Sequence, residues 1–279
     1  MWCVLKQIAA TYHKKLAMTF SLVAIENLLL LTYPIFAGFS INAIIQGEQL
    51  KALSYAFVVL MIWVIGASRR KVDTQTFAKI YSELAVPIIL NQRTQGKSHS
   101  AVTARVTLSR EFVDFFENHL PTFITSIVSI FGAVMMLLLI EFWVGIASLI
   151  ILIIFALFIP KWVQKIDRLY FKLNNRLEKE VGLIDKASEV RLNKHYQLMA
   201  KLRILISNRE ALNFLYIGFS VALLFAIAIT LMVNTANINA GHIYSVMTYL
   251  WTFAISLDDS PRLIEQYAKL KDIGNRVEL

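Results

Sequence analysis

The chain has 279 residues, of which 57% are hydrophobic and 17% are charged, and its mean hydropathy is +0.58. Soluble globular domains are nearer half apolar with about a quarter of their residues charged, so this composition excludes the soluble class. The net charge of +9 would suit nucleic acid, but in a membrane protein basic residues report topology, and we expect no nucleic-acid partner.

Two apolar segments open the chain. The first, residues 16–45, is longer than the about 7–15 apolar residues of a signal peptide, so we expect a retained membrane span. The second, residues 52–68, is followed at once by Arg69-Arg70-Lys71. This basic run predicts a stop-transfer signal and an anchor for anionic lipid headgroups.

The most apolar stretch is residues 120–160, in which Glu141 is the only charged residue. One helix of this length would measure about 61 Å, twice the hydrocarbon thickness of a bilayer. We therefore expect two spans, residues 120–140 and 142–160, joined by a turn at Glu141-Phe142-Trp143 whose carboxylate reaches water at the membrane surface.

Two further apolar segments, residues 214–233 and 243–257, bring the expected spans to six. Small residues recur at every fourth position of the fifth segment, which predicts close packing against another helix. They are Gly218, Ala222, Ala226 and Thr230.

The basic residues set the orientation. With six spans, every Lys and Arg except Lys51 lies on one side, together with both termini. The positive-inside rule makes that side cytoplasmic.

The two long cytoplasmic connections, residues 69–119 and 161–213, carry apolar residues at spacings of three and four, as in Ile166, Leu169, Leu173 and Leu177. This is the amphipathic helical pattern, so we expect the spans to continue into the cytoplasm as helical hairpins. Their reversals are expected in residues 91–100, rich in Gly, Ser, Gln and Asn, and in residues 180–187, around Gly182.

Local sequence then points to a family. Tyr33-Pro34-Ile35-Phe36-Ala37-Gly38, Ala104-Arg105-Val106, Ile238-Asn239-Ala240-Gly241-His242-Ile243 and Asn275-Arg276-Val277 occur in the order and at the topological positions of similar motifs in ABC exporters. The chain thus resembles the six-helix membrane domain of an ABC exporter of type IV, an all-α membrane protein. The resemblance covers almost all of residues 1–279 as one domain and implies a multi-pass protein of the bacterial inner membrane.

The resemblance implies a subunit that forms a substrate cavity with a second copy or a similar chain, while a separate subunit binds and hydrolyses ATP. Helices four and five would cross to the partner, and the hairpin tips would act as coupling helices. The coupling candidates are Asn91, Gln92, Arg93, Gln95, Lys97, Gly182, Leu183 and Asp185.

No phosphate-binding loop is expected in this chain. Gly96-Lys97-Ser98 is its only Gly-Lys-Ser, and Asn91 stands where a phosphate loop needs its first glycine. We therefore expect no enzymatic activity and no cofactor bound by this chain, with ATP on the separate subunit. The five histidines lack metal-ligand spacing, so no metal site is expected either.

The candidates for a substrate cavity are polar or aromatic residues of the first and sixth spans: Glu26, Asn27, Tyr244, Tyr249, Trp251 and Asp258. A carboxylate within a span is costly unless it faces water or a partner, so Glu26 is either a cavity site for a cation or proton or a structural hydrogen-bonding group. The aromatic residues line the cavity by the resemblance, or else pack. Asp258 faces the cavity or marks the membrane boundary.

Two alternative functions stay open at this stage. Some peptide-uptake proteins resemble ABC membrane domains but run on protons without an ATPase, and there Glu26 would carry the proton. A membrane scaffold or regulator that transports nothing is the third hypothesis.

Overall fold

The computed structural model describes residues 2–94, 113, 115–184, 188–235 and 238–259, and every regular element in these ranges is helical. The all-α membrane fold is therefore confirmed. In chain order the elements are α1 (Trp2–Ile45), α2 (Gln49–Ala52), α3 (Ser54–Thr94), the π-helical turn η1 (Phe115–His119), α5 (Leu120–Ile140), α6 (Phe142–Ile184), α7 (Glu189–Val233) and α8 (Ala240–Asp258).

Four helices extend far beyond the length that a membrane requires. Helices α1, α3, α6 and α7 contain 44, 41, 43 and 45 residues. At 1.5 Å per residue each is about 60–70 Å long, twice the hydrocarbon core. The predicted helical continuation is thus confirmed for α3 and for the pair α6 and α7, while part of the predicted hairpin 69–119 lies outside the described residues.

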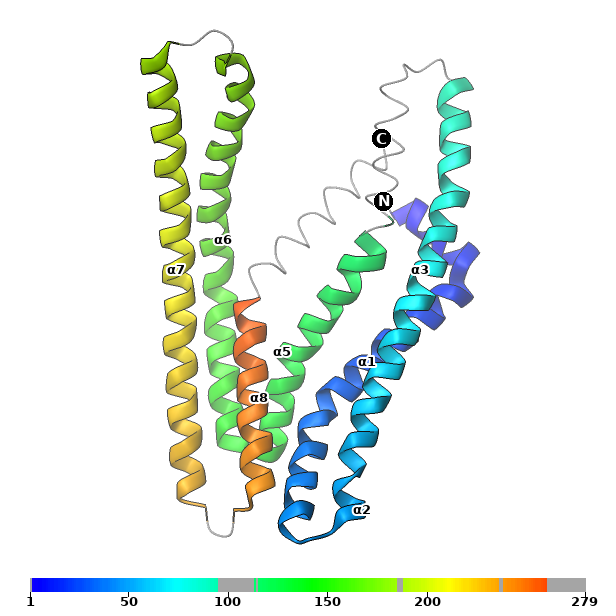
Figure 1. Ribbon diagram of the computed structural model, residues 1–279, viewed down its shortest axis with the longest axis vertical. Helices are drawn as coiled ribbons and strands as arrows, with labels where there is room; N and C mark the ends of the chain where they lie inside the picture. The colour runs from blue at the N-terminus through cyan, green and yellow to red at the C-terminus, as the bar shows by residue number, and fades with distance from the viewer. Residues whose placement is uncertain (1, 95–112, 114, 185–187, 236–237, 260–279) are drawn as a thin grey trace.

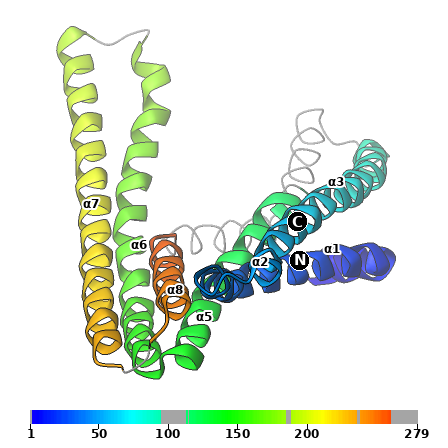
Figure 2. The same ribbon diagram turned by 60° about the horizontal axis from the view of Figure 1, so that its bottom comes forward.

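The helices diverge from one end of the molecule. Figure 1 shows α6 and α7 side by side as one arm and α1 with α3 as another, while α5 and α8 lie between them. The turns that follow α1 and α5, the end of α7 and the start of α8 lie at the bottom of this view, which we call the closed end; the far ends of α3, α6 and the start of α7 form the open end. The turned view in Figure 2 shows the same divergence.

The main core lies toward the closed end and joins α5, α6, α7 and α8. Leu137, Val144, Leu224 and Phe253 contribute fully buried side chains from these four helices. A second, smaller cluster around Leu173, Met199 and Ile206 holds α6 against α7 in the arm. As far as the described residues show, the α6–α7 arm is therefore anchored in the main core at one end and held by its own pairing at the other.

Two turns at the closed end show how the chain reverses. Between α5 and α6 only Glu141 departs from helical geometry, with φ −137° and ψ 86°, so the predicted turn is confirmed and is a single residue long. After α1, Gly47 adopts φ 76°, a left-handed conformation that glycine takes without a Cβ penalty.

Five helices are long and apolar enough to cross a bilayer, counted over the described residues: α1, α3, α5, α6 and α7. Helix α8 is not among them. Its 19 residues measure about 28 Å, close to the hydrocarbon thickness, and it packs on α1, α5 and α7. Its role as a sixth span, and the treatment of residues 1–279 as one domain, stay predictions.

Helix α8 also stabilises the irregular part of α1. Pro34 lies inside α1 and lacks the N–H that would continue the hydrogen-bond ladder. Nearby carbonyl groups are bound from α8 instead, because the Ser245 hydroxyl donates to the Pro34 oxygen at 2.9 Å and the Tyr249 hydroxyl to the Leu31 oxygen at 2.5 Å. The polar residues of α8 are thus partly explained by the proline in α1.

The stripe of small residues on α7 does not pack within this chain, contrary to the expectation. Gly218, Ala222, Ala226 and Thr230 are exposed, and a Cβ at Gly218 would meet no atom within 4 Å. The buried face of α7 carries larger residues instead, including Ile217, Val221, Leu224, Ala228 and Met232. The spacing identified a face correctly but not its partner.

Candidate functional site

The closed end is held by hydrogen bonds among α1, the α5–α6 turn and the start of α8. Asn239 caps α8 by accepting from the His242 backbone N–H at 2.8 Å, and it also accepts from the Asn42 amide at 2.9 Å. Asn42 in turn accepts from the Gly241 N–H at 2.8 Å. These contacts give a structural role to residues 238–243, one of the segments that resemble ABC exporter motifs, and to Asn42 of α1.

Glu141 and His242 form the second tie at this end, with Oε1 and Nε2 2.8 Å apart. The Glu141 side chain is only 17% exposed, so the expectation that its carboxylate simply reaches water is wrong. Trp143 is largely exposed, as a residue at the membrane surface should be. The pair fastens α8 to the turn between α5 and α6.

Two glycines let α1 and α8 approach at backbone distance. A Cβ at Gly38 would lie 2.3 Å from the Gly241 carbonyl oxygen, and a Cβ at Gly241 would lie 2.0 Å from the Gly38 oxygen. Neither position has room for any side chain. A shallow pocket of about 250 Å³ remains beside them, lined by residues that include Phe39, Asn42 and His242.

The three aromatic candidates on α8 have different surroundings. Tyr249 is enclosed and bonded to α1, so it packs and does not face an open cavity in this conformation. Tyr244 is 39% exposed and Trp251 is 60% exposed, with an edge contact from Trp251 to Phe225 of α7. Tyr244 and Trp251 therefore remain available to a ligand or a partner.

Asp258 is the last residue of α8 and is exposed beside Asp259. Partial burial raises the pKa of the Asp258 carboxyl, and the neighbouring Asp259 carboxylate raises it further. The pair places negative charge at the end of α8 that points toward the open end (Figure 1).

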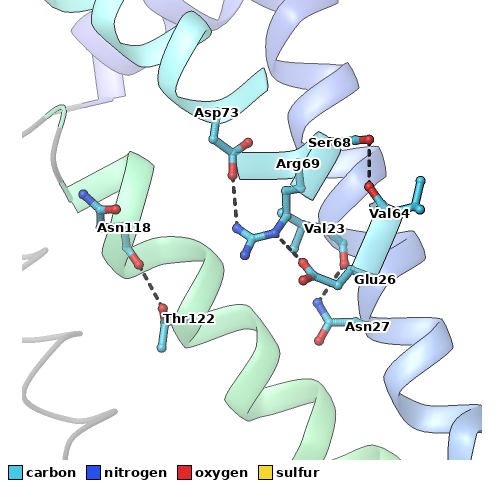
Figure 3. A network of polar contacts seen from close by, with 9 residues as sticks. All are labelled: Val23, Glu26, Asn27, Val64, Ser68, Arg69, Asp73, Asn118 and Thr122. Carbon is cyan, nitrogen blue, oxygen red and sulfur yellow. Dashed lines mark hydrogen bonds and ion pairs between the residues drawn. The ribbon is translucent and has the colours of Figure 1, made fainter. Parts of the chain in front are cut away.

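A charged cluster joins α1 to α3, as Figure 3 shows. Arg69 of α3 forms an ion pair with Glu26 of α1, and its Nη1 lies 3.1 Å from Oδ2 of Asp73, one turn further along α3. The side chains of Arg69 and Glu26 are 18% and 16% exposed, and that of Asp73 is 2% exposed. Asn27 takes no part, because its amide donates to the Val23 carbonyl within α1.

This cluster corrects the interpretation of two sequence features. Arg69 binds two carboxylates inside the protein, so it is not the lipid anchor predicted for Arg69-Arg70-Lys71; Arg70 and Lys71 are exposed and keep that prediction. Glu26 lies 19 residues before Ile45 at the closed end, about 28 Å along α1, so it lies near the edge of a bilayer core rather than at its centre.

The arm formed by α6 and α7 presents charged side chains around an apolar seam. A groove of about 430 Å³ runs between the helices, lined by Lys172, Arg176 and Lys201 together with Leu198, Leu202 and Leu205. Tyr196 donates to Glu180 at 2.7 Å near the open end and ties the two helices there.

The coupling candidates fall at or beyond the ends of the long helices. Asn91, Gln92 and Arg93 continue α3, and Gly182 and Leu183 continue α6. Gly182 is thus helical: α6 runs to Ile184 and Ser188 precedes α7, so the reversal overlaps the predicted residues 180–187 but lies after Gly182 rather than around it. Gln95, Lys97 and Asp185 lie outside the described residues. Among the described residues no cluster of metal-binding side chains occurs.

Comparison with known proteins identifies the family. Residues 5–241 match the family of the ABC transporter transmembrane region, with no match to a nucleotide-binding domain. The match covers most of the chain, which therefore belongs to this family and is a multi-pass membrane protein. No curated protein matched the sequence.

Sequence reasoning missed Asp73, His242 and the partners of Glu26. The charged residues around Asp73 are typical of the solvent-exposed face of a helix. Only the one-turn spacing of Arg69 and Asp73 indicated an ion pair. No sequence signal joined Glu141 to His242, which are 101 positions apart.

Proposed function

We propose that this chain is the membrane-spanning subunit of an ABC-type transporter in the bacterial inner membrane, with both termini cytoplasmic. It works with a second copy or a closely similar chain, and a separate subunit hydrolyses ATP. The observation that carries the proposal is the arrangement of the two arms: both are fastened at the closed end and diverge toward the open end. Such arms can move as rigid bodies about the closed end and alternate access to a cavity.

The exposed face of α7 supports a second membrane chain as partner. Its small-residue stripe is open in this chain, and large apolar residues beside it, Leu215, Phe219 and Leu223, are 62%, 77% and 56% exposed. Lipid can cover the large residues, but small residues at every fourth position favour close contact with another helix. Residues 218–230 therefore belong to the proposed interface.

A substitution on this stripe tests the dimer. Gly218 is exposed and a Cβ there meets no atom of its own chain within 4 Å, so the Gly218→Leu monomer should fold normally while the dimer is lost. The mass of the solubilised protein, measured by light scattering with the detergent contribution subtracted, reports the change. Ala156→Leu, at an exposed small residue of α6, is the matched control and should leave the mass unchanged. A Gly218→Leu protein that stays dimeric places the interface elsewhere.

The ATPase partner is tested at the hairpin tip. ATP hydrolysis should copurify with the chain from native membranes and disappear when residues 91–100 are replaced by a Gly/Ser segment of the same length. Replacing residues 46–48 at the closed end is the control, because a cytoplasmic subunit would not reach it. Copurification that is unaffected by the tip replacement would locate the docking site elsewhere. Transport that stops with an uncoupler yet persists without ATP would refute ATP coupling.

Tyr244, Trp251 and Asp258 are the cavity residues that we retain in this proposal, because they are exposed on α8. Glu26 and Tyr249 are engaged by Arg69 and Leu31. For the proton-driven alternative, the pairing of Glu26 with Arg69 means that Glu26 is poorly suited to carry the proton.

A further inference from the structure

The charged cluster between α1 and α3 has more negative than positive groups. Among the described residues, Arg69 is its one cation and is shared by two carboxylates, Glu26 and Asp73. The other charged residue that acts on Asp73 among the described residues is Glu117 of η1, a further carboxylate, which accepts from the Thr74 hydroxyl at 2.8 Å. With every carboxylate ionised, a buried Asp73 would share its only cation and face a like charge.

The hydrogen bonding of Asp73 is also incomplete. Oδ2 is bound by Arg69, but Oδ1 is buried without a hydrogen-bond partner, and so is the hydroxyl of Thr19 on α1. Thr19 is fully buried and its side chain adjoins the Asp73 carboxyl. A buried polar atom with no partner is costly. The Thr19 hydroxyl can pair with Oδ1 either by donating to a carboxylate or by accepting from a carboxylic acid, so the charge of the cluster decides which form is present.

We propose that Asp73 is a proton-binding site. One proton adds to Oδ1 and no other bond forms or breaks; the resulting O–H donates to the Thr19 hydroxyl. The proton removes one of the negative charges that Arg69 does not balance, leaves Arg69 paired with Glu26, and gives the buried Oδ1 a hydrogen bond to Thr19. A calcium or magnesium ion fits poorly, because these ions take six or more oxygen ligands and no metal-binding cluster occurs among the described residues.

The proton would couple two elements that the transporter must move. Asp73 lies on α3 beside α1, and Glu117, whose charge opposes that of Asp73, lies on η1 at the start of α5. Loss of the proton sets two carboxylates against each other between α3 and η1. Its gain lets these elements pack closely. This inference holds whether or not an ATPase powers transport.

The pH dependence of stability provides the test. An aspartic acid that keeps its proton when folded but loses it on unfolding makes the folded state progressively less stable as pH rises above about 4. Asp73→Asn cannot titrate. Its unfolding midpoint should therefore rise relative to the wild type between pH 5 and pH 8, by about 3–5 °C for each pH unit over which Asp73 stays protonated. Asp167→Asn, at an exposed aspartate of α6, should show no such trend.

The opposite interpretation gives a different curve. If Asp73 is simply the ionised partner of Arg69, Asp73→Asn is less stable than the wild type by a constant amount from pH 5 to pH 8, and the proposal fails. If the trend follows sodium concentration at fixed pH instead, the ligand is a monovalent cation and the proposal also fails.

Infrared spectroscopy tests the same group without relying on the Asn variant. The wild type should show the carbonyl stretch of a protonated carboxylic acid at neutral pH. Thr19→Val keeps the side-chain volume but removes the acceptor, so the band should shift in frequency and disappear at a lower pH. Absence of the band from the wild type at pH 7, or its persistence unshifted in Thr19→Val, overturns the assignment.

Discussion

The two ends of the molecule are built from different interactions. At the closed end, α1 and α8 meet through the glycines at positions 38 and 241, and short hydrogen bonds among Asn42, Asn239 and the backbone fix their register. In the described ranges, the arms share no buried cluster at the open end, and the cluster around Leu173 holds α6 and α7 to each other. Close backbone packing resists relative movement, whereas separate arms permit it.

This contrast leads us to expect a pivot at the closed end and movement of the two arms. Without a hydrophobic driving force between helices in lipid, small residues and interhelical hydrogen bonds are what hold a membrane bundle together. The close contact between glycines lies at the closed end, while the arms carry interhelical hydrogen bonds such as Tyr196–Glu180 and, between α1 and α3, the charged cluster around Arg69. We therefore expect substitutions at the closed end to affect the whole fold, and those in the arms to affect movement or assembly.

The largest effect is expected at Gly241. Gly241→Ala places a Cβ 2.0 Å from the Gly38 oxygen, so α1 and α8 must separate. The free energy of unfolding in mixed micelles should fall by about 3 kcal/mol, at the upper end for an overpacked core. Gly218→Ala, whose Cβ meets nothing in this chain, should change it by less than about 0.5 kcal/mol. Similar losses of unfolding free energy for Gly241→Ala and Gly218→Ala would contradict the idea that close backbone packing holds the closed end together.

The next largest effect is expected at Arg69. Arg69→Met leaves the carboxylates of Glu26 and Asp73 without their cation, and the loss should be about 2–3 kcal/mol because the cluster is partly rather than fully buried. The neighbouring Arg70 is exposed, so Arg70→Met should change the free energy of unfolding by less than about 0.5 kcal/mol. Equal losses would mean that Arg69 acts as a lipid anchor after all.

The sequence predicted the helices well because one periodic signal dominates a membrane chain. Apolar runs interrupted by Glu141 located the boundary between α5 and α6 to the residue, and the three-and-four spacing around Leu173 indicated the long arm. Helix α8 is less apolar than the five candidate spans because it contains Ser and Tyr residues whose hydroxyls bind carbonyls of α1 near Pro34. The sequence could not give this reason, because it depends on how α1 and α8 pack together.

The candidate sites were less predictable because their partners lie far apart in sequence. Glu26 was identified as a candidate because an ionised carboxylate is costly in a membrane. Its role, however, depends on its ion pair with Arg69, which lies on another helix. Tyr249 and Trp251 are two positions apart on one aromatic helix, but only the structure separates the packed residue from the exposed one. Periodicity shows that a helix has faces, and the neighbouring helices decide which face is buried.

A smaller effect at the closed end is expected for Glu141 and His242. A double-mutant cycle with Glu141→Ala and His242→Ala should give a coupling of about 1 kcal/mol, as for a partly buried hydrogen bond. Glu48 and Lys51 also form a pair at this end, but both are well exposed, so their cycle should give about 0.3 kcal/mol. A larger coupling for the exposed pair would show that the Glu141–His242 tie adds nothing to the closed end.

The smallest effect on stability is expected at Trp251, in the middle part of α8. Trp251→Phe keeps the edge contact with Phe225 and should cost less than about 0.5 kcal/mol. The fluorescence difference between the wild type and this variant reports the surroundings of one indole. If Trp251 lies in the water-filled pathway that widens toward the open end, aqueous acrylamide should quench that difference and brominated lipid should not. The reverse result would show that Trp251 faces lipid, and the pathway would then have to follow the Tyr244 side of α8.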